Sequence, residues 1–91
     1  MKKQEFKQGE WVVRRWAKDN GGETDFVRFD HEFSQTEFTW SEFYRIRKNK
    51  LEVLTRENDR NIDYYDSRMS LQFRKATKSE IQKFSEMIVN H

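Results

Sequence analysis

The segment Trp11–Trp16 places two tryptophans and two valines within six positions of a chain that is otherwise mostly polar. Tryptophan and valine both favour a pleated, half-buried surface, and the glycine before the segment and the turn residues after it favour a strand over a helix. Because side chains alternate across a strand, each face of this one would carry apolar side chains and one arginine. One face would present Trp11, Val13 and Arg15, and the other Val12, Arg14 and Trp16. We therefore expect a strand around which the rest of a small sheet is built.

A core rich in aromatic rings has to stabilise this fold, because the chain offers no other device. Its 91 residues make a single domain, residues 1–91, and the absence of cysteine excludes disulfides and thiolate metal sites. Eight phenylalanines are the largest stock of core residues, and each buried ring removes on the order of 150–250 Å² from water. Residues 1–5 should be frayed, and no apolar run approaches membrane-spanning length. We expect a soluble, cytoplasmic protein that needs no cofactor.

The sequence Asn20-Gly21-Gly22 is a strong signal for a hairpin turn, because asparagine and glycine tolerate a positive φ angle. A second strand should follow the turn and pair antiparallel with the first. Its apolar face would hold Val27, Phe29, His31 and Phe33, which alternate with polar residues. On that face His31 would be a hydrogen-bonded histidine of the core or of its rim.

Residues 34–55 allow two interpretations. The spacing from Ser34 to Glu37 fits a helix capping box, and one helical face could hold Phe43, Ile46 and Leu54. Alternatively, the segment is a hairpin with its turn at residues 48–50, and one face of its first strand would hold Phe38, Trp40, Tyr44 and Ile46. We favour the hairpin, with a short helical turn at residues 34–37 as the alternative for its beginning.

Local signals define the end of the chain. Residues 61–66 fit either a short strand or a loop, whereas Met69, Leu71 and Phe73 alternate with polar residues as in a final strand. Thr77 and Glu80 have the spacing of a capping box, and the apolar residues that follow fall on one helical face. This pattern predicts a helix at residues 78–89 that lies across an open end of the sheet.

Two stretches resemble known proteins. Phe6–Val13, in which a glycine and an acidic residue precede a short apolar strand, resembles the opening strand of SH3-like barrels. Phe73–Ile81 is similar to the ending of many short phage and bacterial proteins, where a last strand passes through Arg-x-Ala-Thr into a helix that begins with Glu-Ile. The resemblance covers only the two ends of the chain and implies a non-enzymatic accessory protein. The expected fold is mainly β: a small curled antiparallel sheet, an SH3-like partial barrel, with one C-terminal helix.

The sequence carries no signature of an active site. It has two histidines, no cysteine, no phosphate-binding glycine loop and no His/Glu spacing typical of a metal site. Asp59, Asp63 and Asp66 could be considered as ligands of a hard cation, but the glycine that a calcium loop requires is missing. We therefore expect no catalytic residues and no metal.

Arginine and lysine interleaved with aromatic residues give the strongest functional signal. Small barrels that bind single-stranded nucleic acid use cations for the backbone and ring faces for stacking bases. A formal net charge of +2 permits such a surface without requiring it. The candidate residues for binding nucleic acid or another partner are Arg14, Arg15, Trp40, Arg45, Arg47, Lys48, Lys50 and Tyr65.

Three hypotheses stay open for this surface. In the first, the rings are core and the cations are solvated and neutralised by Glu10, Glu42, Glu52 and Glu57. In the second, the surface binds nucleic acid. In the third, the chain is a phage-type inhibitor, such as an anti-defence protein, that binds a host protein through exposed rings such as Trp40 or Tyr65. We favour a binding module over an enzyme, and nucleic acid over a protein partner by a small margin.

Overall fold

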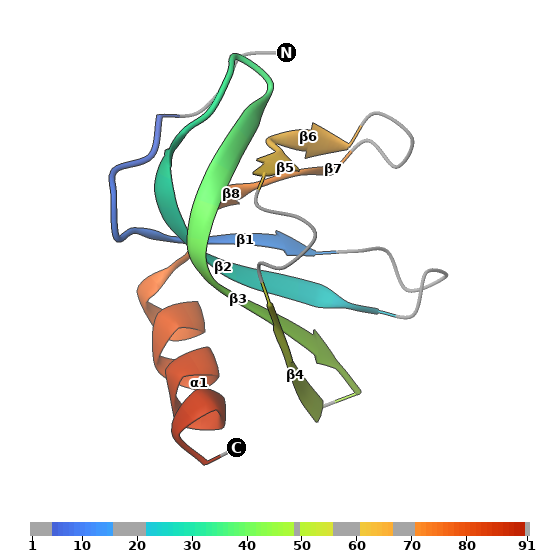
Figure 1. Cartoon of the computed structure of the whole chain (residues 1–91). Coiled ribbons are helices and arrows are strands. Elements are labelled where there is room, and N and C mark those ends of the chain that lie inside the picture. The colour runs from blue at the N-terminus through green and yellow to red at the C-terminus, as the bar shows by residue number, and fades with distance from the viewer. Residues whose placement is uncertain (1–4, 16–21, 49, 56–60, 67–70, 91) are drawn as a thin grey trace.

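The computed structural model of the chain describes residues 5–15, 22–48, 50–55, 61–66 and 71–90. The elements in chain order are β1 (Trp11–Arg15), β2 (Thr24–Glu32), β3 (Glu37–Arg47), β4 (Lys50–Leu54), β5 (Asn61–Asp63), β6 (Tyr65–Asp66), β7 (Leu71–Gln72), β8 (Arg74–Lys75) and α1 (Lys78–Val89). Six strands form an antiparallel sheet in the order β4-β3-β2-β1-β8, with β5 paired to β3, and β6 pairs with β7 in a second sheet (Figure 1). The sheet is curled but not closed, so the predicted mainly β fold with one C-terminal helix is confirmed.

The alternation predicted for the first strand is confirmed where the chain is described. Val12 belongs to a cluster on one face of the sheet, whereas Trp11 and Val13 pack in a cluster on the other face. β1 pairs antiparallel with β2, as the predicted turn between them requires. Trp16 and Asn20-Gly21 lie outside the described residues.

Residues 37–54 form the hairpin of β3 and β4, so the helical interpretation of this segment was wrong. Ser34 does cap a bend, because its Oγ accepts hydrogen bonds from the N–H groups of Thr36 and Glu37, but the chain continues as a strand. The segment forms a strand and not a helix because β3 pairs with β2 along one edge and with both β4 and β5 along the other. These inter-strand hydrogen bonds and the burial of aromatic side chains outweigh the local capping signal.

The predicted face of β3 was wrong. Register shifts interrupt the pairing of β2 with β3, so that Arg28 pairs with Glu42 but the next residue of β2, Phe29, pairs with Trp40. An extra residue in one strand reverses the alternation beyond it. As a result Phe38 and Trp40 lie in one cluster, while Tyr44 and Ile46 lie in the other.

A second register shift lies between Phe29 and His31, and it changes the predicted face of β2. His31 is not part of an apolar face: its side chain is 64% exposed, and its Nδ1 lies 2.8 Å from Oδ2 of Asp30 and 3.1 Å from Oγ1 of Thr39. Phe33 follows the end of the strand and is 59% exposed. The prediction that these two residues share the apolar face of β2 was therefore wrong, and neither is core. The hydrogen bonding predicted for His31 is confirmed.

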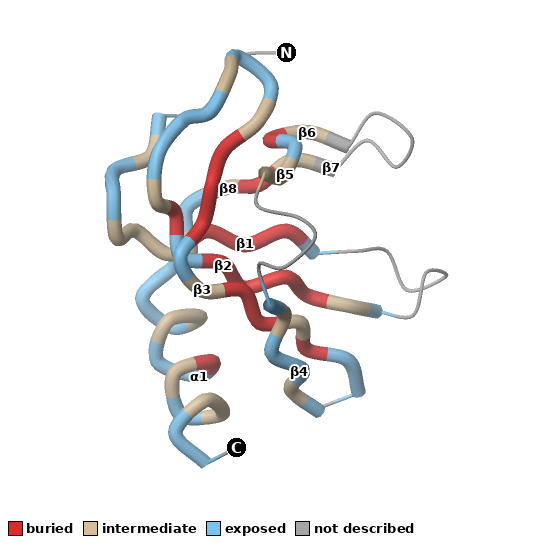
Figure 2. The backbone as a smooth tube through the Cα atoms, in the orientation of Figure 1, coloured by how far each residue is buried: buried red, intermediate tan, exposed pale blue. Residues whose placement is uncertain are grey.

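Two apolar clusters cover the two faces of the sheet. Buried residues follow the central strands β1, β2 and β3 (Figure 2). On the helix face, α1 packs its Phe84 against strands β1 to β3, and the rings of Phe84 and Phe26 lie 5.0 Å apart. Trp11 is half-buried there and stacks on Phe26 at 4.2 Å. The opposite face is covered by Phe6 and by the segments around β5 to β8, and its buried residues are Val12, Val27, Phe29, Phe38, Trp40, Phe43, Tyr64 and Phe73. The helix thus covers a face of the sheet, not an open end as the sequence suggested.

At the C-terminal end of the chain, the predicted helix is confirmed and the predicted final strand was partly wrong. α1 spans Lys78–Val89 with Thr77 as N-cap, and both hydrogen bonds of the capping box to Glu80 are present. The predicted final strand is divided at Phe73, whose N–H donates to the carbonyl of Tyr64 at 2.9 Å, so that β7 and β8 pair with different partners. Residues 61–66, which fitted either a strand or a loop, contain the short strands β5 and β6. Met69 lies outside the described residues.

Replacement of Phe84 by alanine should lower the free energy of unfolding by about 3–5 kcal/mol, because the ring is 2% exposed and fills the helix face of the core. Urea denaturation followed by tryptophan fluorescence measures the change. Val89→Ala is the matched control: Val89 is 82% exposed on the same helix, and its truncation should change stability by less than about 0.5 kcal/mol. Equal effects of the two substitutions would show that the helix does not cover the core.

The carboxylate of Glu80 joins the helix cap to the last strand. Arg74 donates two hydrogen bonds to it, at 2.8 and 2.9 Å, and the N–H of Thr77 donates a third at 2.9 Å. These bonds, those from Arg74 foremost, lower the pKa of Glu80 to about 2 against the opposing effect of burial.

This low pKa makes the stabilisation by Glu80 depend on pH. Since the folded-state pKa is depressed, the contribution of the carboxylate is fully present above the unfolded pKa, near 4.5, and is lost as the pH falls toward 2. The difference in unfolding free energy between the wild type and Glu80→Gln should therefore be constant from pH 7 to pH 5 and shrink below that. A difference independent of pH down to 2 would contradict the assignment. Denaturant titrations at a series of pH values measure it.

Candidate functional site

A row of alternating charges crosses four adjacent strands on the face opposite the helix. Arg14 of β1 pairs in register with Asp25 of β2, which pairs with Arg45 of β3, which pairs with Glu52 of β4. The neighbouring row on the same face is wholly apolar and consists of Val12, Val27, Phe43 and Leu54. The charged row therefore lies directly at the border of the core.

Asp25 is the centre of this row and is fully buried. Its Oδ2 accepts a hydrogen bond from Nη2 of Arg14 at 3.1 Å, and its Oδ1 accepts one from Nε of Arg45 at 3.0 Å. Arg14 is only 7% exposed and also lies over the ring of Phe73, 4.4 Å from its centroid. Burial disfavours the charged form of Arg45, but the hydrogen bond and the negative charge of Asp25 outweigh this effect and raise the pKa of the guanidinium. The buried carboxylate of Asp25 is thus shared by two arginines, and Arg45 also lies 3.5 Å from a carboxylate oxygen of Glu23.

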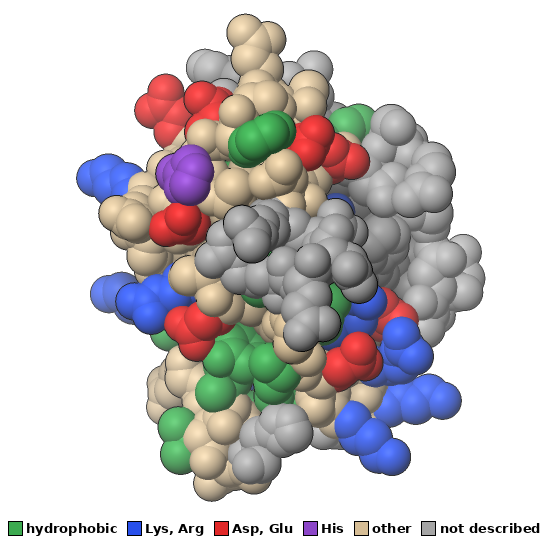
Figure 3. All heavy atoms as spheres, in the orientation of Figure 1, with side chains coloured by type: hydrophobic (Ala, Val, Ile, Leu, Met, Phe, Trp, Pro, Cys, Tyr) green, Lys and Arg blue, Asp and Glu red, His purple; other side chains and the backbone are tan. Residues whose placement is uncertain are grey.

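Beyond the charged row, the strand ends carry four exposed cations, which we call the basic end: Arg15, Arg47, Lys48 and Lys50. Arg47 and Lys50 pair directly across the β3–β4 hairpin. Side chains of lysine and arginine gather at this hairpin in the space-filling view (Figure 3, lower right). Two carboxylates reduce the charge of this end, because Arg47 forms an ion pair with Glu23 and Arg15 lies 3.9 Å from Glu80. The lysines carry no ion pair with a carboxylate among residues 5–15, 22–48, 50–55, 61–66 and 71–90, so this end keeps a positive surface.

The two aromatic candidates, Trp40 and Tyr65, do not lie on this surface, and neither does Tyr44, the ring next to Arg45 in the sequence. Trp40 is 3% exposed and packs edge-on against Phe43 at 5.3 Å, so its interpretation as an exposed anchor was wrong. Tyr44 lies on the helix face and donates its hydroxyl hydrogen to Glu42, which raises the pKa of Tyr44 to about 12. Tyr65 is half-buried on β6, in the separate two-stranded sheet. No ring among these three is available at the basic end for stacking on a base.

Three predicted residues meet in a small cavity of about 220 Å³ beside the charged row. Its lining includes Arg14 and Arg45 of the charged row together with Trp40 and Phe43. Of the eight candidates, six are cations of the charged row or of the basic end, Trp40 is buried beside the row, and Tyr65 lies on β6 in the second sheet.

Sequence reasoning missed the two carboxylates that organise these cations, Asp25 and Glu23. Neither was among the acids expected to neutralise the surface, which were Glu10, Glu42, Glu52 and Glu57. The position of Asp25 next to Phe26, at the start of an apolar strand, was the available signal.

The described part of the chain holds no group of three or more histidine, cysteine, aspartate or glutamate side chains that could bind a metal ion. Asp63 lies on β5, whereas Asp59 is outside the described residues and the side chain of Asp66 is not described. Among the described residues, no helix has the length and apolar character needed to cross a membrane.

These features define a small, mainly β domain with a structural ion-pair row and a cationic end. No family model, curated protein or solved structure matches the chain. The resemblance to SH3-like proteins of phage and bacterial type therefore stays a prediction.

Replacement of Asp25 by asparagine should lower the free energy of unfolding by about 3–5 kcal/mol, because it leaves two poorly exposed guanidinium groups without their shared carboxylate. Glu52→Gln is the matched control, since Glu52 lies in the same row but is exposed on the edge strand, and it should cost less than about 1 kcal/mol. Urea denaturation of both variants measures the difference. If Asp25→Asn is as mild as the control, the row does not stabilise the sheet.

Proposed function

We propose that this protein is a small, non-enzymatic binding module that contacts the phosphates of nucleic acid through its basic end. The observation that carries this proposal is the grouping of the exposed cations Arg47, Lys48 and Lys50 at the β3–β4 hairpin. Arg15 adds a fourth exposed cation at the end of β1, which β2 separates from β3. Exposed cations clustered on one side of a nearly neutral protein create the local potential that attracts a polyanion. A cytoplasmic accessory role of the phage or bacterial type belongs to the same proposal.

The mode of contact differs from the one that the sequence suggested. Stacking on bases requires exposed ring faces, and Trp40 and Tyr44 are buried. The binding is therefore electrostatic and directed at the backbone, with little preference for sequence. Single strands and duplexes should both bind, since both present phosphates.

The other end of the sheet supports this orientation. Acidic residues follow β2 and β3 toward their opposite ends, where Asp30, Glu32 and Glu37 lie, and Asp63 pairs with Glu37 from β5. A polyanion is repelled from that end and attracted to the hairpin end. Between these two ends of β2 and β3, as far as the structure describes them, the hairpin end is the one that suits nucleic acid.

Titration of a fluorescein-labelled oligonucleotide by anisotropy at a series of salt concentrations tests the proposal. The logarithm of the association constant should fall linearly with the logarithm of salt concentration, by about 0.7 to 0.9 per phosphate neutralised. Lys48→Ala and Lys50→Ala should each weaken binding and reduce this slope by about 1 without changing stability.

Lys7→Ala is the matched control, because Lys7 is an exposed lysine of the N-terminal segment, away from the β3–β4 hairpin. It should leave the affinity and the slope unchanged. No binding at low salt, or equal losses for Lys7 and the two hairpin lysines, would refute a phosphate-binding surface at the basic end.

A protein partner is the second candidate, and Phe33 is the observation in its favour. This ring is 59% exposed in the turn between β2 and β3, and exposed aromatic side chains are frequent anchors of protein interfaces. It replaces Trp40 as the residue to test. A protein that is retained by the wild type and lost on Phe33→Ser, together with an absence of oligonucleotide binding, would favour this function over the first.

A further inference from the structure

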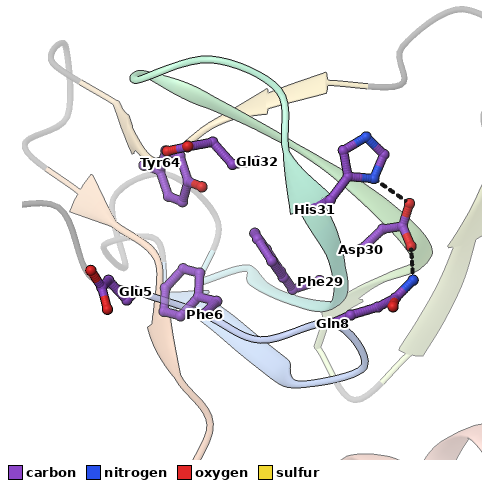
Figure 4. A pocket seen from close by; sticks show the side chains of 8 residues that line it. All are labelled: Glu5, Phe6, Gln8, Phe29, Asp30, His31, Glu32 and Tyr64. Carbon is purple, nitrogen blue, oxygen red and sulfur yellow. Dashed lines mark hydrogen bonds and ion pairs between the residues drawn. The ribbon is translucent and has the colours of Figure 1, made fainter.

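A cavity of about 520 Å³ lies on the side of the sheet away from the basic end (Figure 4). It is formed by the N-terminal segment, the end of β2 and the residue between β5 and β6. Its lining residues are Glu5, Phe6, Gln8, Phe29, Asp30, His31, Glu32 and Tyr64. None of these is a lysine or an arginine, although both are common in the rest of the chain. The cavity is thus distinct from the surface proposed for nucleic acid.

Aromatic rings form the apolar part of the cavity. The ring of Phe6 lies 5.5 Å from that of Phe29 and 6.0 Å from that of Tyr64, with the three rings at different inclinations (Figure 4). Phe29 and Tyr64 are buried, whereas Phe6 is half-buried. Because Phe29 and Tyr64 are anchored in the core, this wall of the cavity is preformed.

A carboxylate is fixed beside these rings. Asp30 accepts a hydrogen bond from Nε2 of Gln8 at 3.0 Å through Oδ1, and its Oδ2 lies 2.8 Å from Nδ1 of His31 (Figure 4). Thr39 also donates to it, at 3.4 Å. These bonds, with that from Gln8 foremost, lower the pKa of Asp30, so it is ionised at neutral pH. The carboxylates of Asp25, Glu23 and Glu80 each pair with an arginine. The contacts of Asp30 described here come instead from Gln8, His31 and Thr39.

We propose that this cavity binds an organic cation, an ammonium or guanidinium group on an alkyl chain. The half-buried ring of Phe6 offers aromatic surface to the cation, and the buried rings of Phe29 and Tyr64 line the cavity behind it with apolar contact for the alkyl chain. The carboxylates of Glu5, Asp30 and Glu32 attract the charged head. A metal ion fits less well, because hard cations require several converging oxygen ligands and the described residues hold no such group. Lysine or arginine side chains of a peptide and free polyamines share this chemistry.

Titrations followed by two-dimensional amide NMR test the proposal. The probes are n-butylammonium and n-butylguanidinium chloride, with sodium chloride at equal ionic strength as the reference. The expected result is saturable shifts centred on Gln8, Asp30 and His31, absent with sodium. Shifts of the same size with sodium chloride, or shifts that do not saturate, would overturn the proposal. A tetralysine peptide and spermidine then distinguish the two sources: tighter binding of the peptide identifies a protein side chain, and tighter binding of spermidine a free polyamine.

Two substitutions connect the shifts to the cavity. Glu32→Gln and Phe6→Leu should each weaken n-butylammonium by about two- to fivefold, through loss of charge and of a ring face respectively. Glu86→Gln is the matched control for the first, because Glu86 is an exposed acid on α1, and it should leave the affinity unchanged. If Glu32→Gln and Glu86→Gln weaken the cation equally, the attraction is a property of net charge and the proposal fails. Oligonucleotide binding by Glu32→Gln should not fall, so failure of this site and failure of the basic end are distinguishable.

Discussion

The buried carboxylate of Asp25, held between Arg14 and Arg45, is the interaction on which the arrangement of the sheet depends. It fixes β2 against both of its neighbours at once. A slip of one residue would move the carboxylate to the helix face, into the position of Phe26, and expose an unpaired charge to the core. Such a slip is prohibited by its desolvation cost, so the row specifies the register of three central strands. The charged row selects one register of strand pairing, and it can do so without making the sheet more stable than an apolar row at the same positions would.

Once the register is fixed, the two faces of the sheet acquire different coverings. Regular alternation in β1 directs Val13 to the helix and Val12 to the opposite face. The register shifts between β2 and β3 then let the long third strand serve both: its first half places Phe38 and Trp40 opposite the helix, and its second half places Tyr44 and Ile46 under it. Without a bulge, one face of β3 would carry nearly all of its rings and the other would lack a core.

Local signals predicted what local chemistry decides. The capping box of Thr77 and Glu80 identified the start of the helix, the apolar stripe identified its extent, and alternation identified most strands. Long-range pairing was less accessible. A two-residue turn at Asn20-Gly21 would place Arg14 opposite Val27, whereas the observed register places it opposite Asp25, so the central ion pair could not be derived from the turn signal. The prediction that Trp40 is exposed failed for a related reason. A run of alternating residues carries no marker of a bulge, so the sequence did not show on which side of the bulge each ring of β3 lies.

Strands β2 and β3 run from the basic end to the acidic cavity. The distance between these two surfaces decides whether the charges of one affect binding at the other. The cavity residues Phe29 and His31 pair with Trp40 and Thr39 of β3, and from there to Arg47 the strand covers about 25 Å at ~3.3 Å per residue. Exposed charges are screened over about 8 Å at physiological ionic strength, several times less than this separation. A polyanion at the hairpin therefore feels its local cations and not the carboxylates around Asp30, although the whole chain is nearly neutral. The small net charge of the whole chain thus conceals two ends of opposite charge. Each end presents a field of its own sign, and each can select a partner of the opposite sign independently of the other.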